Sequence, residues 1–140
     1  MNANDATLTE LATAQSGSMV NDDAPNAPAS GGFDLIVGAV AGSALGSSGA
    51  PYTLTISAID LTTVSQPWPP QILHQAFDPA SGWKLSGTGP DYESTQTIPN
   101  TISGGPDGPL AGHTLQFVAS LISQGAQIVT IRQSDPFVLV

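Results

Sequence analysis

The residues of this 140-residue chain that could act as acid, base or nucleophile are few, and we predict no catalytic residue among them. Cysteine is absent, and the two histidines, His74 and His113, are far apart in the sequence. A Ser-His-Asp triad needs its serine on a sharp turn such as Gly-x-Ser-x-Gly, and the Gly-Ser-Ser-Gly cluster at 46–49 lacks that spacing. A hydrolase that uses His113 therefore ranks third among our hypotheses.

Metal binding has equally little support in the spacing of potential ligands. A zinc site needs three or four convergent ligands, and the two histidines are not in His-x-His or His-x-x-x-His spacing. Aspartates at 22–23, 78, 91 and 107 lie in segments expected to be loops, where calcium finds its oxygen ligands. Aspartate is also a common turn former. We therefore predict no metal and no cofactor, with calcium as the open alternative.

Aromatic residues are the better indication of a ligand. Trp68 lies in the stiff segment Pro-Trp-Pro-Pro, Trp83 follows a turn, and Tyr92 stands next to Asp91. Exposed indole and phenol rings beside a carboxylate could bind a glycan, the rings against its C–H groups and the carboxylate to its hydroxyls. The structural alternative is that Trp83 is the central tryptophan of the core and Trp68 covers one end of it.

The elements that would position these residues are mostly short strands. In 52–58 and 113–121 apolar and polar residues alternate, which is typical of half-buried strands, and 123–126 forms a turn into another strand at 127–132. Weaker strand patterns recur between Gly- and Pro-rich turns. The inward residues are predicted to be buried together: Leu54, Ile56, Leu115, Phe117 and Leu121.

About seven short strands in residues 33–140 predict an all-β domain, an antiparallel β-sandwich. A long strand, an irregular middle and a long hairpin near the C-terminus resemble an immunoglobulin-like Greek key in layout. The Cys…Trp…Cys spacing of immunoglobulin domains is missing, so the resemblance names no family. A small jelly roll would produce similar signals.

Residues 1–32 are predicted to be an N-terminal arm outside this domain. Residues 5–12 could form a short helix with Leu8 and Leu11 on one face, and 16–32 has the small, polar, Pro-containing composition of a linker. A helix of this length is marginal alone in water, so the two leucines would need a contact, which we assign to another subunit. Deleting residues 1–30 should then leave the sandwich folded.

The charge balance excludes two classes of partner. Eleven acidic residues against two basic ones give a net charge of −9, which excludes a nucleic-acid binder and docking on anionic lipid. No secretory signal or transmembrane helix is visible, because the N-terminus has no basic residue and the apolar run at 33–45 is too short to span a bilayer. This places the protein in the cytoplasm or on a signal-less export route.

Only 9% of residues are charged, so much of the surface must be neutral and could pack against a neighbour without desolvating charges. The chain also ends on an apolar segment, where Phe137 and Leu139 could add to a neighbour's sheet. Our leading hypothesis is a non-enzymatic interaction module that self-associates or docks into a larger assembly, with another copy of the chain as its expected partner and Leu8, Leu11, Phe137 and Leu139 as contacts. The alternative is a carbohydrate-binding module that uses Trp68, Trp83, Tyr92 and Asp91.

Overall fold

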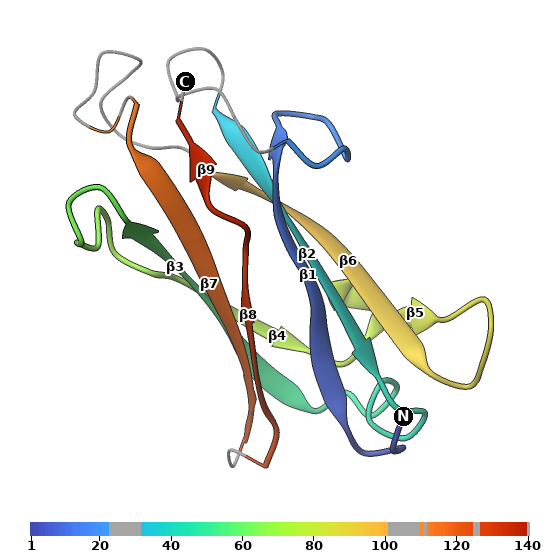
Figure 1. Cartoon of the computed structure of the whole chain (residues 1–140). Coiled ribbons are helices and arrows are strands. Elements are labelled where there is room, and N and C mark those ends of the chain that lie inside the picture. The colour runs from blue at the N-terminus through green and yellow to red at the C-terminus, as the bar shows by residue number, and fades with distance from the viewer. Residues whose placement is uncertain (23–31, 101–109, 111, 125–126, 140) are drawn as a thin grey trace.

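The computed structural model describes residues 1–22, 32–100, 110, 112–124 and 127–139 (Figure 1). It confirms the predicted all-β fold: 55% of residues are in strands, and two antiparallel sheets pack together as a β-sandwich. The described residues contain no α-helix, and η2 (Pro79–Ser81) is a single 3-10 turn. No helix in those ranges is long and apolar enough to cross a membrane.

Each sheet combines strands that are distant in the sequence (Figure 1). The first sheet has the order β1 (Ala6–Gln15), β2 (Phe33–Ala41), β6 (Tyr92–Asn100) and β5 (Lys84–Leu85). The second has the order β4 (Gln71–Ala76), β3 (Pro51–Asp60), β7 (Thr114–Ser123) and β8 (Val129–Gln133), and the short β9 (Phe137–Val138) pairs with the start of β7.

This strand order agrees with the predicted immunoglobulin-like Greek key. The chain crosses from the first sheet to the second between β2 and β3, returns between β4 and β5, and crosses again between β6 and β7. Immunoglobulin domains have the same arrangement, four strands in the order A-B-E-D against C-F-G, with an extra strand beside C in some of them. The turns and alternating strands predicted from the sequence are therefore those of an immunoglobulin-like sandwich, which forms here in a chain without cysteine.

The core lies between the sheets where the alternating residues of β3 and β7 face β2. Leu54, Ile56, Leu115, Phe117 and Leu121 are each at most 2% exposed, which confirms the inward positions predicted from the alternation. The Phe117 ring stacks on Phe137 with centroids 5.5 Å apart and meets Phe33 of β2 at 6.0 Å. These rings join the two sheets.

The predicted helix at residues 5–12 is wrong, because this segment belongs to β1. A β-bulge between Leu8 and Glu10 adds one residue to the strand, so Leu8 pairs with Ala39 and Leu11 pairs with Val37 on the same, inward face. The bulge thus lets two leucines three residues apart face inward from one strand, although this spacing is also typical of one turn of a helix.

The segment after β1 is also attached to the sandwich as far as the structure describes it. The Gly17 amide donates to the Asp34 carboxylate at 2.9 Å, and the Asp22 amide donates to the Thr13 carbonyl at 2.8 Å. Residues 23–31 of the predicted linker lie outside the described residues. Residues 1–22 are therefore not an arm separate from the domain.

Candidate functional site

The most distinctive surface is the outer face of the second sheet, the side turned away from the core. On β3 and β7 the residues between the buried ones point outward, and the register of the pairs puts alternate residues of β4 and β8 on the same side. We call this surface the outer face; its residues are Thr53, Thr55, Ser57, Ile59, Ile72, His74, Gln116, Val118, Ser120, Ile122, Val129, Ile131 and Gln133.

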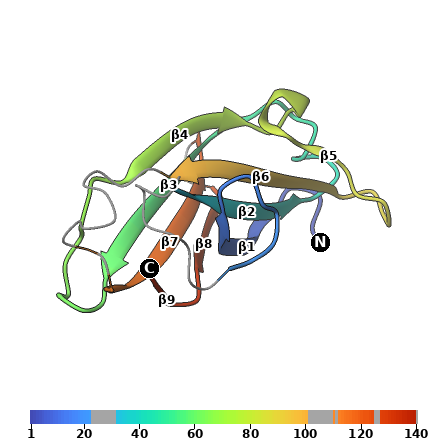
Figure 2. The same ribbon diagram turned by 90° about the horizontal axis from the view of Figure 1, so that it is seen from above.

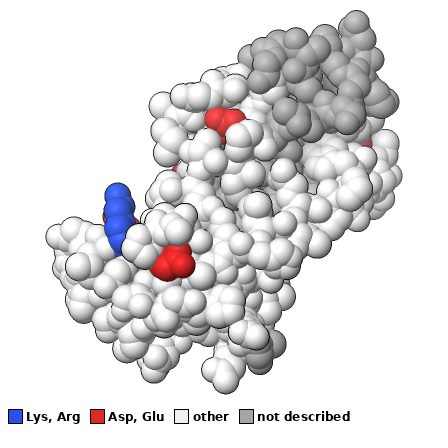
Figure 3. All heavy atoms as spheres, turned by 180° about the vertical axis from the view of Figure 1, so that it is seen from behind, with Lys and Arg blue, Asp and Glu red and all other residues white. Residues whose placement is uncertain are grey.

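The outer face carries no Asp, Glu, Lys or Arg among these residues, and His74 is its one titratable side chain. The nearest charged residues on these strands point elsewhere: Asp60 is buried, and Arg132 pairs with the inward Ala119. Figure 3 shows that charge is scarce on the back of the molecule too, where only a few blue and red side chains interrupt the white surface. A chain of net charge −9 thus presents one uncharged sheet face.

The outer face is also where exposed aliphatic side chains gather. Ile131 is 63% exposed and Ile72 and Val129 are each 56% exposed, joined by the less exposed Ile59 and Ile122. Branched side chains and threonines are stiff about their first torsion, so they lose little freedom when another surface covers them. Chemically, this face can form an apolar contact rimmed by hydroxyls and amides.

The first sheet differs on its outward side. Glu10 pairs with Gly38 and Glu93 pairs with Val40, which places both carboxylates on the side opposite the core. Lys84 lies 3.9 Å from Glu93 in an exposed ion pair. Covering this side would require the removal of charged groups from water, which is unfavourable.

The four residues predicted to contact another subunit lie in the core instead. Leu8 and Leu11 are 2% and 5% exposed, and Phe137 and Leu139 are 3% and 1% exposed. The bulge turns the two leucines inward, and β9 pairs Phe137 with Leu115 of its own chain. Since the fold uses all four side chains internally, they are not available as surface contacts, and this prediction is corrected.

The aromatic residues proposed as a glycan platform do not gather on one surface. Trp83 is 3% exposed, and its ring lies 5.1 Å from that of Phe77 in the core. Trp68 is half-buried against Phe117 toward one end of β3, whereas Tyr92 packs near the loop that leads into the other end. The structural alternative weighed for Trp83, a core tryptophan, is the one the structure shows.

Asp91, the carboxylate proposed for this platform, lies beside the chain terminus. One of its oxygens is 3.8 Å from the N-terminal amine of Met1 in a half-buried position. Trp83 is buried, and Trp68 and Tyr92 lie apart from each other. No pair of exposed rings therefore lies beside Asp91 to bind a sugar together with its carboxylate.

A polar network joins the sheets around Tyr52, a residue the sequence analysis did not single out. The Trp83 indole Nε1 donates to the Tyr52 hydroxyl at 3.1 Å, and that hydroxyl donates to Gln75 Oε1 at 2.8 Å. Gln75 of β4 and Gln96 of β6 exchange two amide hydrogen bonds at 2.6 and 2.9 Å. Burial raises the pKa of Tyr52, the Trp83 bond acts in the opposite direction, and the charge of Asp78 adds to the rise.

A second buried polar pair is Asp60 with His113. Asp60 Oδ2 lies 2.7 Å from His113 Nδ1, and Asp60 Oδ1 accepts from the amide of Thr62 at 2.9 Å. Burial of the carboxyl opposes its ionisation, but the hydrogen bonds from His113, Thr63 and Thr62 outweigh it, and the pKa of Asp60 is lowered. Among the described residues, no hydroxyl side chain is hydrogen-bonded to His113, so a hydrolase that uses this residue stays a hypothesis.

Sequence alone held a weak signal for the Asp60–His113 pair. The alternation of β3 continues past Ala58, so position 60 faces inward, and an inward aspartate requires a partner. This pattern does not indicate which residue hydrogen-bonds to Asp60. For metals, no three His, Asp or Glu side chains come together within the described residues. Asp23 and Asp107 lie outside them, so calcium stays the open alternative to the prediction of no metal.

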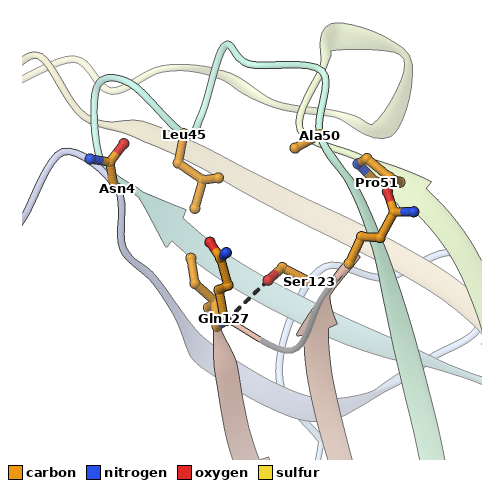
Figure 4. A pocket seen from close by; sticks show the side chains of 8 residues that line it. Asn4, Leu45, Ala50, Pro51, Ser123 and Gln127 are labelled. Atoms are coloured by element: carbon orange, nitrogen blue, oxygen red, sulfur yellow. Dashed lines mark hydrogen bonds between the residues drawn. The ribbon is translucent and has the colours of Figure 1, made fainter.

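A pocket of about 600 Å³ opens at the end of the sandwich where β3 begins and β7 turns into β8 (Figure 4). The Ile128 amide donates to Ser123 Oγ at 3.0 Å and holds the turn beside the pocket. Figure 4 shows Gln127 and Leu45 facing each other across the hollow. The wall is uncharged and mixes amides with aliphatic groups; its residues are Asn4, Leu45, Ala50, Pro51, Ser123, Gln124, Gln127 and Ile128.

Comparison with protein-family models, with curated proteins and with solved structures finds no match for this chain.

Proposed function

We propose that this protein is a non-enzymatic β-sandwich module that self-associates through the outer face of its second sheet. The observation that carries this proposal is an uncharged, partly aliphatic face spanning four strands in a chain of net charge −9. The partner is a second copy of the chain, with its outer face turned toward the first.

Electrostatics favours this face over the rest of the surface. Two copies that each carry −9 repel one another, and the repulsion is greatest where carboxylates approach closely. A contact between two outer faces keeps Glu10 and Glu93, which lie on the opposite sheet, away from the interface in both copies. It also avoids the cost of removing charged groups from water.

The size of the face sets the expected strength. The four strands are five to ten residues long. At a spacing of about 4.8 Å they cover roughly 400–600 Å² per copy. The two copies together would then bury roughly 800–1,200 Å², at the lower limit of specific interfaces. We therefore expect weak association that depends on protein concentration.

The test compares charge placed on the outer face with charge placed elsewhere. Ile131→Lys puts an ammonium group on β8 at a 63% exposed position, and Leu85→Lys does the same on β5 of the first sheet at a 60% exposed position. Sedimentation velocity should show a mass that rises with concentration for the wild type and for L85K but not for I131K. A wild type that is monomeric at every concentration, or equal association of both variants, would overturn the proposal.

A second candidate is the binding of a small neutral ligand such as a glycan in the pocket at the end of the sandwich. The observation that favours it is the presence of three carboxamide side chains, Asn4, Gln124 and Gln127, in a wall without charged groups. Amides can donate and accept hydrogen bonds with hydroxyl groups. Calorimetric titration with a glycan panel tests it: binding that Gln127→Ala weakens supports this site, and no binding refutes it.

A further inference from the structure

The edges of the two sheets are not equally protected against pairing with another chain. An exposed edge strand offers unpaired N–H and C=O groups, and proteins protect such edges with bulges, charges or cover. β1 has the bulge near Glu10, and β5 is two residues long and carries Lys84. β8 carries Arg132 and faces β1, where the Leu8 amide donates to Thr130 Oγ1 at 3.1 Å.

β4 has none of these devices. Its six residues, Gln-Ile-Leu-His-Gln-Ala, include no Asp, Glu, Lys, Arg or Pro, and they pair with β3 in an uninterrupted register from Gln71 to Ala76. The strand runs along the rim of the molecule (Figure 2). Among the described edge strands longer than two residues, it is the one that another strand can approach without meeting a charge or a bulge.

The local hydrogen bonds show which backbone groups of β4 point outward. The Phe77 amide donates to the Ala50 carbonyl at 3.0 Å, so Phe77 faces β3. The next residue inward, Ala76, faces away, because its amide bonds to Ser81 Oγ at 3.2 Å and its carbonyl accepts from the Asp78 amide at 2.8 Å. Antiparallel ladders alternate with a period of two, so Ile72 and His74 also direct their N–H and C=O away from β3.

We propose that β4 pairs with β4 of a second copy, antiparallel and centred on Leu73, so that the two second sheets join into one continuous sheet. This inference rests on the proposed self-association and adds a second contact to it. In this register Ile72 of each copy lies opposite His74 of the other. Each copy supplies two N–H donors and two C=O acceptors, which together form four hydrogen bonds across the edge.

The flanking residues fit a second copy of this same strand. In the register centred on Leu73, Pro70 lies opposite Ala76 of the other copy. Pro70 has no N–H to donate, and the backbone groups of Ala76 are already bonded to Ser81 and Asp78. The ladder therefore ends on both sides at a residue that has no free N–H to offer. It also brings the two outer faces side by side on one surface, free of charged side chains.

A disulfide cross-link tests the register directly. The chain has no cysteine, so Leu73→Cys introduces a single thiol at the centre of the proposed ladder. Residues 73 of the two copies would form a non-hydrogen-bonded pair with Cα atoms about 4.5 Å apart, within the range that a disulfide spans. Leu85→Cys, at a more exposed position on the β5 edge of the other sheet, is the control for random collision, which exposure favours.

With oxidised glutathione as the electron acceptor, L73C should form disulfide-linked dimers faster than L85C. The expected difference is about tenfold or more, because a paired contact holds the thiols at an effective concentration in the millimolar range. Adding Ile72→Pro to L73C should slow the cross-link, because it removes an outward N–H and leaves the bonds to β3 in place. If that double variant fails to fold, the comparison of the cross-linking rates of L73C and L85C still tests the β4 pairing.

The outcomes separate this inference from the proposed function. If the wild type associates and I131K does not, yet L73C cross-links no faster than L85C, the face contact stands and the β4 pairing is wrong. Fast L73C cross-linking supports the pairing whether or not I131K reduces the mass. A wild type that stays monomeric, with slow cross-linking of both cysteine variants, overturns both.

Discussion

Asp60 Oδ2 and His113 Nδ1 are 2.7 Å apart at the end of the sandwich where β3 stops and β7 starts. They join the loops next to these two central strands, and the carboxylate, 1% exposed, also accepts from the backbone of Thr62. The pair is thus a buried structural connection, and its ionisation links folding to pH.

Acid should weaken the sandwich through Asp60. Its pKa is lowered in the folded state, so the unfolded chain takes up the proton first as pH falls below the ordinary value of about 3.9. The stabilisation is fully present above that value and is lost as pH falls through the folded pKa. We expect Asp60→Asn to cost about 1–3 kcal/mol at pH 7. Urea unfolding should show this difference shrinking in acid; a pH-independent difference would contradict it.

The Tyr52 phenol should resist ionisation in the folded protein. Burial raises its pKa, so the folded state keeps the proton when the unfolded chain has lost it, and stability should fall as pH rises above about 10. Ultraviolet titration of the phenols should show one of the two tyrosines ionising late. Tyr92→Phe should retain the late transition, and Tyr52→Phe should remove it.

Tyr52→Phe should also destabilise the protein at neutral pH. The Trp83 indole N–H is buried and donates to the Tyr52 hydroxyl, so the substitution leaves that donor unpaired. The expected loss is about 1–3 kcal/mol in the free energy of unfolding. Chemical denaturation measures it, with Tyr92→Phe as the control; equal effects of the two substitutions would show that the indole finds another acceptor.

Phe117→Ala should be among the most damaging substitutions. The ring is 1% exposed and contacts Phe33, Phe137 and Trp68, which come from three other segments of the chain. Removing it should cost about 3–5 kcal/mol, because the cavity lies between both sheets. A loss below about 1 kcal/mol in urea unfolding would be too small for a core ring of this size.

Salt should strengthen self-association. High ionic strength screens the repulsion between two copies of net charge −9. The attraction between two uncharged outer faces is weakened little by salt. The apparent mass should therefore increase with added salt. Lowering the pH toward the isoelectric point of about 4.1 should act in the same direction. Light scattering measures both; weaker association in salt would indicate a contact made by charges instead.

Deletion of residues 1–15 should unfold the sandwich or lower its melting temperature strongly. β1 pairs with β2 along its whole length and contributes Leu8 and Leu11 to the core. This reverses the expectation drawn from the sequence, in which the N-terminal residues were dispensable for folding. A truncated protein that melts like the full chain would restore that expectation.

The sandwich could be predicted from the sequence because alternate side chains of a strand lie on the same face, which is a local property of the chain. In 52–58 and 113–121 every second residue is apolar, and a strand has no other way to put those residues on one face. It failed at residues 5–12 because the bulge between Leu8 and Glu10 changes the phase of the strand. Bulges depend on the partner strand, which is far away in the sequence.

Composition and local alternation by themselves determined that the protein is acidic, sparsely charged and built of strands, since these properties require no knowledge of which residues meet. Only the tertiary structure decided which face is free of charge and which edge is open. Thr55, Ile72 and Ile131 come from three strands that the Greek key brings into one sheet. Likewise, Asp60 and His113 lie within hydrogen-bond distance because β3 and β7 pair in the second sheet. Long-range pairing creates such sites, and no local pattern encodes it.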